Sequence, residues 1–162
     1  MLKKIGLFFV ASLVIFVAGG IALGNTYTIQ KTYFVSTNKQ ALTTYLSDAN
    51  NWAKWFYPKH KHAQVKENTL TITTNNDTII NINLIDTSAQ TFAFVIQATG
   101  NEIRTTLQFK PMTPSQDRTK IIAVLHGKSD FSPINGYTNL FIQASLEGIF
   151  NSSFAKLDEI FK

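Results

Sequence analysis

The chain of 162 residues contains no cysteine, and only 15% of its residues are charged. The lack of cysteine excludes a small disulfide-stapled scaffold and a zinc site built on thiolates. The hydrophobic fraction of 44% excludes an intrinsically disordered chain. The formal net charge of +5 is modest, so no nucleic acid partner is expected. One folded domain with a core of ordinary size is therefore expected.

Motifs for catalysis are also absent. The sequence has no G-x-S-x-G turn of the kind that presents a nucleophilic serine. The three histidines are His60, His62 and His126, which we predict to be solvated at the surface, with no metal and no cofactor. The carboxylates that could form an acid/base pair are Asp86, Glu102 and Glu147. They fall on faces expected to be wet, so we predict no catalytic residue and do not favour an enzyme.

The sequence does contain a long apolar run, residues 5–24, in which Ser12 is the only polar side chain. As an α-helix it would be about 30 Å long, which matches the hydrocarbon thickness of a bilayer. Lys3 and Lys4 precede it and favour an amino end in the cytoplasm. We therefore predict a transmembrane anchor in residues 1–24. The remainder, residues 25–162, would be a domain outside the cytoplasm, in the periplasm or at the cell surface.

A cleaved secretory signal is the alternative for the same run. Ala22-Leu23-Gly24 has the small-x-small form of a cleavage site, and cleavage would leave a secreted protein. The run is longer than the core of a usual signal, which favours a retained anchor. Both alternatives make residues 25–162 the folded domain.

The domain begins with a pattern of one strand and two short helices. Residues 27–35 mix β-branched and aromatic residues, which is typical of a strand. Thr37 and Gln40 have the spacing of a capping box, which predicts a short helix after them. A second short helix, capped by Asn51, would carry Trp52 and Trp55.

Period-two alternation follows in short segments from residue 62 to residue 128, and a helical period covers residues 137–162. The alternation predicts antiparallel strands with one apolar face, formed by Ile80, Ile82, Leu84, Phe92, Phe94, Ile96, Ile103, Leu107 and Phe109. The long helix would cover this face with one apolar stripe, formed by Ile142, Leu146, Ile149, Phe150, Phe154, Leu157, Ile160 and Phe161. Tyr137, Leu140, Phe141 and Ala144 widen its apolar stripe, so we expect its first half to be enclosed more completely than its end.

The order of these elements and two residue clusters resemble the START and Bet v 1-like superfamily (SRPBCC proteins, which include polyketide cyclase-like members). The clusters are FVSTNKQALTTYLSDANNWAKWFYP, residues 34–58, and Phe154-Ala155-Lys156-Leu157 near the end of the chain. The resemblance implies an α+β helix-grip fold. Its curved antiparallel sheet would have about seven strands, with two short helices after the first strand and a long C-terminal helix. The superfamily shares no catalytic set, so no catalytic residue can be carried over.

The helix-grip fold implies a pocket between the sheet and the last helix, lined by apolar groups. We predict that a membrane-tethered domain binds a hydrophobic small molecule or lipid there, without chemistry. The predicted lining residues are Trp55, Ile82, Phe92, Phe94, Ile103, Leu107, Phe109, Phe141, Ile149 and Phe150.

Two other functions are possible, and the role of one surface cluster is undecided. A cyclase or aromatase-like enzyme would need a polar group in the pocket, such as His126, Glu147 or Tyr137. A pocketless domain could instead dock a protein partner at the membrane. The basic cluster consists of Lys54, Lys59, Lys61 and Lys66, which could face anionic headgroups at a membrane surface or form a solvated loop. The sequence does not predict the identity of the ligand or the oligomeric state.

Overall fold

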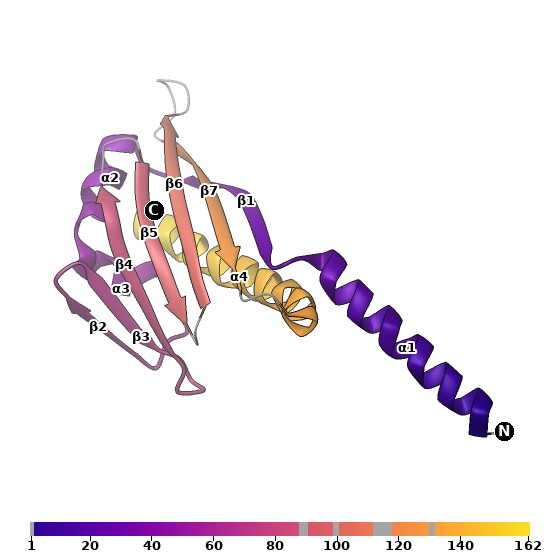
Figure 1. Cartoon of the computed structure of the whole chain (residues 1–162). Helices are drawn as coiled ribbons and strands as arrows, with labels where there is room; N and C mark the ends of the chain where they lie inside the picture. The colour runs from indigo at the N-terminus through magenta and orange to yellow at the C-terminus, as the bar shows by residue number, and fades with distance from the viewer. Residues whose placement is uncertain (1, 88–90, 99–100, 112–117, 130–131) are drawn as a thin grey trace.

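A computed structural model describes residues 2–87, 91–98, 101–111, 118–129 and 132–162. It contains one antiparallel sheet of seven strands and a long helix behind it (Figure 1). The strands are β1 (Thr26–Val35), β2 (His62–Lys66), β3 (Thr69–Thr73), β4 (Ile79–Thr87), β5 (Thr91–Ala98), β6 (Asn101–Pro111) and β7 (Thr119–Lys128). The helices are α1 (Leu2–Leu23), α2 (Lys39–Ser47), α3 (Ala49–Trp55) and α4 (Pro133–Ile160). This architecture confirms the predicted α+β helix-grip fold.

The strand order is β1-β7-β6-β5-β4-β3-β2, so the first strand of the sheet pairs with the last. Thr26 lies opposite Lys128 and Val35 opposite Thr119, which keeps β1 and β7 in register along their whole length. Strands β2 to β7 lie in the sheet in their order along the chain, each antiparallel to the next. In the turn before β4, Asp77 takes a left-handed conformation with φ of 58°.

Alternation along the strands divides the sheet into a buried and a solvated face. In β7 each residue from Thr119 to Leu125 alternates between buried and half-buried. The buried face carries the core, and α4 packs against it with four buried apolar side chains. These are Leu146, Phe150, Phe154 and Leu157. The predicted apolar face of β4, β5 and β6 is confirmed.

The short helices α2 and α3 begin one or more residues away from the predicted caps. Asn38, not Thr37, caps α2: its Oδ1 accepts a hydrogen bond from the N–H of Ala41 at 2.9 Å. Asp48 caps α3 in the same way, whereas Asn51 lies inside that helix. Asparagine, aspartate and threonine are all favoured at the N-cap, so the sequence alone did not distinguish these caps from the polar residues beside them.

Helix α4 is longer than predicted and its first half is less enclosed. It begins at Pro133, with Ser132 as its cap, because proline fits the first turn where its missing N–H is not needed. Leu140 is 49% exposed and Phe141 is 76% exposed. The expectation of a more enclosed first half is wrong, because this half extends beyond the sheet toward α1 (Figure 1).

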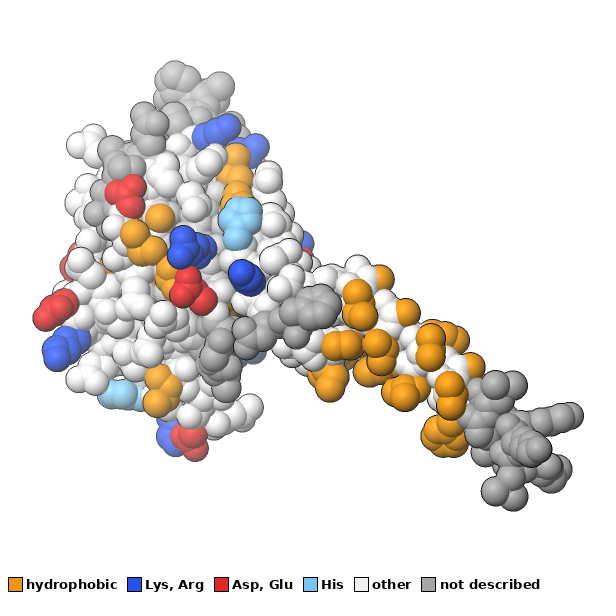
Figure 2. Space-filling view, viewed as in Figure 1, with side chains coloured by type: hydrophobic (Ala, Val, Ile, Leu, Met, Phe, Trp, Pro, Cys, Tyr) orange, Lys and Arg blue, Asp and Glu red, His pale blue; other side chains and the backbone are white. Residues whose placement is uncertain are grey.

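Helix α1 projects from the domain, with hydrophobic side chains along it (Figure 2). The carboxyl end of α1 contacts the amino end of α4. The ring of Phe16 stacks on Tyr137 with centroids 4.8 Å apart, and the Tyr137 hydroxyl donates to the Phe16 carbonyl at 3.0 Å. A Cβ on Gly20 would clash with the backbone of Pro133 in α4, and a Cβ on Gly136 would clash with the Gly20 carbonyl. Part of the apolar run therefore packs against protein.

The predicted single-pass membrane protein is not supported. Side chains of α1 are described from Phe8 onward, and within the described residues no helix is both long and apolar enough to cross a membrane. This finding overturns the expected localisation, a domain held outside the cytoplasm by a membrane span in residues 5–24.

Asp158 links the end of α4 to the segment after β1 by a hydrogen bond. Its Oδ1 accepts a hydrogen bond from the Ser36 N–H at 2.7 Å, and its Oδ2 pairs with the Lys162 Nζ at 2.7 Å. Burial alone raises the pKa of this carboxyl, but the hydrogen bonds from Lys162 and Ser36 outweigh it and hold the pKa below its usual value. The charged form is therefore the one that stabilises the fold.

Replacing Asp158 with asparagine should cost about 1 kcal/mol near neutral pH. Because the folded pKa is lowered, the stabilisation is complete above the unfolded pKa of about 3.9 and is lost as the pH falls through the lower folded value. Urea unfolding of both proteins between about pH 6 and pH 2 tests this linkage. The two curves should converge in acid, and a constant difference would contradict the account.

Candidate ligand-binding site

A hollow of about 250 Å³ lies between the inner face of the sheet and the middle of α4. Its lining is formed by Phe56, Tyr57, Ile80, Ile96, Ile103, Phe141, Ile142, Ser145, Leu146 and Ile149. Eight of these ten residues are aliphatic or phenylalanine. The other two, Tyr57 and Ser145, supply the hydroxyl groups. An apolar hollow with few polar groups is the usual form of a small-molecule site.

The floor of the hollow comes from one rung of side chains across the sheet. Ile96 pairs with Ile103, and Ile103 pairs with Gly127, which has no side chain to fill the inner face. The ring of Tyr27, opposite Gly127 on β1, fills that space instead and would clash with any Cβ there. Burial raises the pKa of Tyr27. The space is thus filled on the β1 side and left open over β5 and β6.

The segment after α3 forms another wall of the hollow, with Phe56 and Tyr57. Tyr57 takes a left-handed conformation with φ of 52°, which costs a non-glycine residue roughly 1–2 kcal/mol. Its N–H donates to the hydroxyl of buried Ser153 on α4 at 2.9 Å. Its carbonyl accepts from the His60 N–H at 3.2 Å. These contacts fix the strained residue against α4.

A second hollow, of about 320 Å³, adjoins the first along α4. It is lined by Tyr57, Pro58, Lys59, Ser145, Gly148, Ile149 and Ser152. Tyr57, Ser145 and Ile149 line both hollows, so these three form the boundary between them. The second hollow is lined in part by one lysine and two serines, whereas no charged side chain lines the first.

The structure places the predicted lining residues in two groups. Ile103, Phe141 and Ile149 line the apolar hollow. The other seven are buried in the core cluster: Trp55, Ile82, Phe92, Phe94, Leu107, Phe109 and Phe150. Their contact with a ligand stays a prediction. Other lining residues were not predicted. Some of them, such as Ile80 and Leu146, belong to the predicted apolar face or helix stripe. Tyr57 and Ser145 belong to neither, and no pattern in the sequence indicated them.

Thr105 is a polar residue in the same apolar face. It is 1% exposed and pairs with Phe94 on one side and Leu125 on the other. Within the described residues its hydroxyl has no hydrogen-bond partner. An unpaired buried hydroxyl costs about 1–3 kcal/mol relative to a satisfied one.

Replacing Thr105 with valine should therefore raise the free energy of unfolding by about 1 kcal/mol or more. Thr119 provides the matched control, because it is equally buried but its hydroxyl donates to the Thr37 carbonyl at 2.8 Å. Thr119→Val should lower stability by about 1 kcal/mol. Chemical denaturation of both variants measures the two changes in stability. Equal losses of stability in the two variants would contradict the view that only the Thr105 hydroxyl lacks a partner.

The four lysines of the basic cluster have different surroundings. Lys61 pairs with Asp77 at 2.8 Å, and Lys54 donates to the Asn51 side chain at 2.8 Å. Lys66 is exposed on β2, and Lys59 lines the second hollow. A role of the cluster toward anionic headgroups stays a prediction.

The polar groups named for a cyclase-like enzyme do not line the apolar hollow. His126 is on the outer face, where its Nδ1 is 3.0 Å from the Thr28 hydroxyl. Glu147 pairs with Lys31 at 2.9 Å, and burial together with this carboxylate raises the pKa of Tyr33 to about 12. Tyr137 contacts α1. Among the described side chains, no cluster of three or more potential metal ligands occurs.

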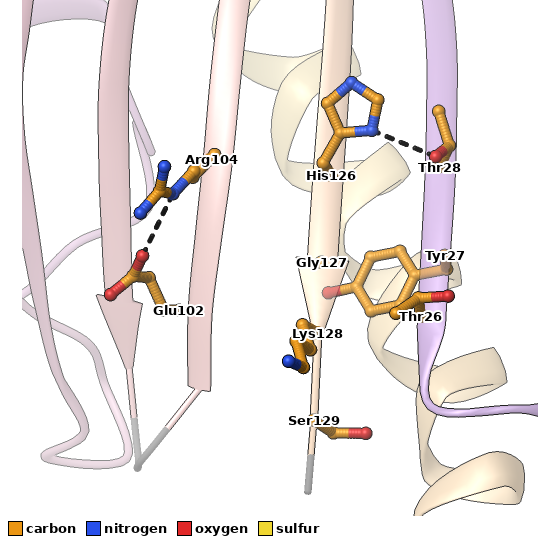
Figure 3. A pocket seen from close by; sticks show the side chains of 9 residues that line it. All are labelled: Thr26, Tyr27, Thr28, Glu102, Arg104, His126, Gly127, Lys128 and Ser129. Atoms are coloured by element: carbon orange, nitrogen blue, oxygen red, sulfur yellow. Dashed lines mark hydrogen bonds and ion pairs between the residues drawn. The ribbon is translucent and has the colours of Figure 1, made fainter.

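A larger hollow of about 590 Å³ lies at the end of β1, β6 and β7 (Figure 3). Its lining is polar, with Arg104 and Glu102 in an exposed ion pair of 3.2 Å and His126 beside Thr28. The alternation of the strands places these four side chains on the solvated face, away from α4. This hollow suits water and ions better than an apolar molecule.

Comparison with known proteins places the fold. No protein-family model and no curated protein sequence matches the chain. Similar solved structures include a START superfamily protein from Mycobacterium smegmatis, with a TM-score of 0.61 and 13% identity over 82% of this chain and 98% of that one. The Zhui aromatase/cyclase from Streptomyces has a TM-score of 0.65 and 9% identity, over 84% of this chain and 93% of that one.

Norcoclaurine synthase from Thalictrum flavum also has a TM-score of 0.65, with 10% identity over 83% of this chain and 86% of that one. At these identities the similarity is one of fold. The chain therefore has the helix-grip fold of START and Bet v 1-like proteins.

Proposed function

We propose that this protein binds a small hydrophobic molecule in the hollow between the sheet and α4 and does not transform it. The observation that carries the proposal is the lining itself, in which eight of ten side chains are aliphatic or phenylalanine. The fold supports it, since a START superfamily protein shares the architecture. The lining contains no carboxylate and no imidazole, and two hydroxyl groups alone give no acid/base pair.

The size of the hollow limits the ligand. Its volume of about 250 Å³ is below the roughly 300–1,000 Å³ of pockets for drug-sized molecules, and the two adjoining hollows together fall within that range. Burying about 300 Å² of apolar surface would contribute on the order of 7 kcal/mol before the costs of association. Binding in the micromolar to millimolar range is expected for a ligand with a short chain.

Native mass spectrometry of the purified chain, followed by organic extraction, tests for a ligand carried from the expression host. Calorimetric titration with straight-chain alcohols of six to ten carbons tests the site directly. We expect saturable binding of one molecule per chain, tighter for longer alcohols. No saturable binding of any alcohol, combined with no extracted ligand, would overturn the proposed function.

A further inference from the structure

We infer that the ligand of the apolar hollow is an amphipathic anion, a short apolar chain that ends in a carboxylate, and that Lys59 is its counter-charge. The inference rests on the proposed function and adds the chemical class of the ligand. Its basis is the juxtaposition of two hollows, one apolar and one that contains a single charged side chain.

The two hollows share a boundary that a chain-like ligand would cross. Tyr57, Ser145 and Ile149 line both. On one side of them lie only apolar side chains, from β4, β5, β6, α4 and, with Phe56, the end of α3. On the other lie Lys59 and Ser152. A molecule with its apolar chain over Ile96 and Ile103 would therefore have its other end near a lysine and hydroxyl groups.

Lys59 is available for this role. Within the described residues it has no ion pair and no hydrogen bond from its side chain, whereas Lys54 donates to Asn51 and Lys61 pairs with Asp77. No carboxylate lines either hollow. The local charge is therefore positive and uncompensated, which favours an anion over a neutral polar group.

The backbone that carries Lys59 is held in place. Residues 57–60 form a turn in which the His60 N–H donates to the Tyr57 carbonyl at 3.2 Å, and the ring of Pro58 fixes its own φ. Ser153 of α4 binds the Tyr57 N–H at 2.9 Å. The turn is thus tied to α4, and the flexible side chain of Lys59 extends from a fixed point beside the boundary.

The test compares an acid with an alcohol of the same chain length. Octanoate and 1-octanol are titrated into the full chain by calorimetry at low ionic strength, with Lys59→Gln as the test variant and Lys54→Gln as the matched control. Lys54 is close in sequence but lines neither hollow. We expect octanoate to bind the wild-type protein about tenfold more tightly than 1-octanol, because a charge-assisted contact is added.

The tenfold preference should disappear in Lys59→Gln, persist in Lys54→Gln, and shrink as salt is added. Binding of 1-octanol should be unchanged in Lys54→Gln, and in Lys59→Gln it should change much less than the binding of octanoate. Equal binding of acid and alcohol, or a preference that survives Lys59→Gln, would overturn this inference while leaving the proposed function standing. If neither compound binds, the proposed function itself fails.

Discussion

Replacing Trp52 with alanine is expected to lower the free energy of unfolding by about 3–5 kcal/mol. The indole is 1% exposed and contacts the rings of Trp55 and Phe94, with centroids 5.1 Å and 4.9 Å away. Its Nε1–H also donates to the Leu46 carbonyl at 2.6 Å, near the end of α2. The substitution removes a large buried ring and leaves that carbonyl without its partner.

Urea denaturation measures the loss, and Trp52→Phe separates its two causes. Phenylalanine keeps most of the ring packing but not the hydrogen bond, so it should cost about 1–3 kcal/mol. A loss below about 1 kcal/mol for Trp52→Ala would contradict the view that the aromatic cluster joins α3 to the sheet.

Ser145→Trp is expected to weaken binding of a hydrophobic ligand at least tenfold, a change of about 1.4 kcal/mol or more. Ser145 lies at the boundary of the two hollows and its side chain is exposed, so an indole there can occupy the space without disturbing the core. The change fills the proposed site instead of removing a contact. It is therefore independent of any particular ligand group.

Ala144→Trp is the matched control, because Ala144 is the preceding residue of α4, is also exposed, and lines neither hollow. Both variants should unfold at nearly the wild-type urea concentration, since surface substitutions change stability little. Titration with 1-octanol then compares the affinities of the two variants with that of the wild-type protein. Wild-type affinity in Ser145→Trp, or an equal loss in both variants, would exclude the hollow as the binding site.

The elements of the fold could be predicted because their signals are periodic. Ile80, Ile82, Phe92 and Phe94 alternate with polar residues, and alternation of period two assigns a whole face at once. The stripe of α4 from Leu146 to Leu157 is equally regular. Caps were less predictable, since Thr37 and Asn38 are adjacent and both can cap a helix.

The candidate site could be predicted only in part. Ile103 and Ile149 belong to periodic faces and were named, but periodicity does not separate a side chain that lines a hollow from one that is packed. Phe94 and Phe150 share those faces and are packed in the core. Tyr57 reaches the site through a left-handed turn, which tertiary contacts with α4 stabilise and no local pattern of residues indicates.

The apolar run of residues 5–24 shows the opposite problem. Hydropathy and length alone indicated a membrane span, but they do not show which residues pack against the rest of the protein. The stacking of Phe16 on Tyr137 and the close approach of Gly20 to Gly136 depend on the position of α4, more than 100 residues later. Such contacts are a property of the tertiary structure.

The central claim is that the hollow between the sheet and α4 takes up a small apolar molecule. Its most direct test is a titration of 1-octanol followed by NMR of isoleucine methyl groups in the full chain. The account predicts saturable shifts for Ile80, Ile96 and Ile103, which line the hollow, and none for Ile121, which is buried elsewhere in the sheet. Unchanged resonances of all three lining isoleucines up to the solubility limit of the alcohol would contradict it.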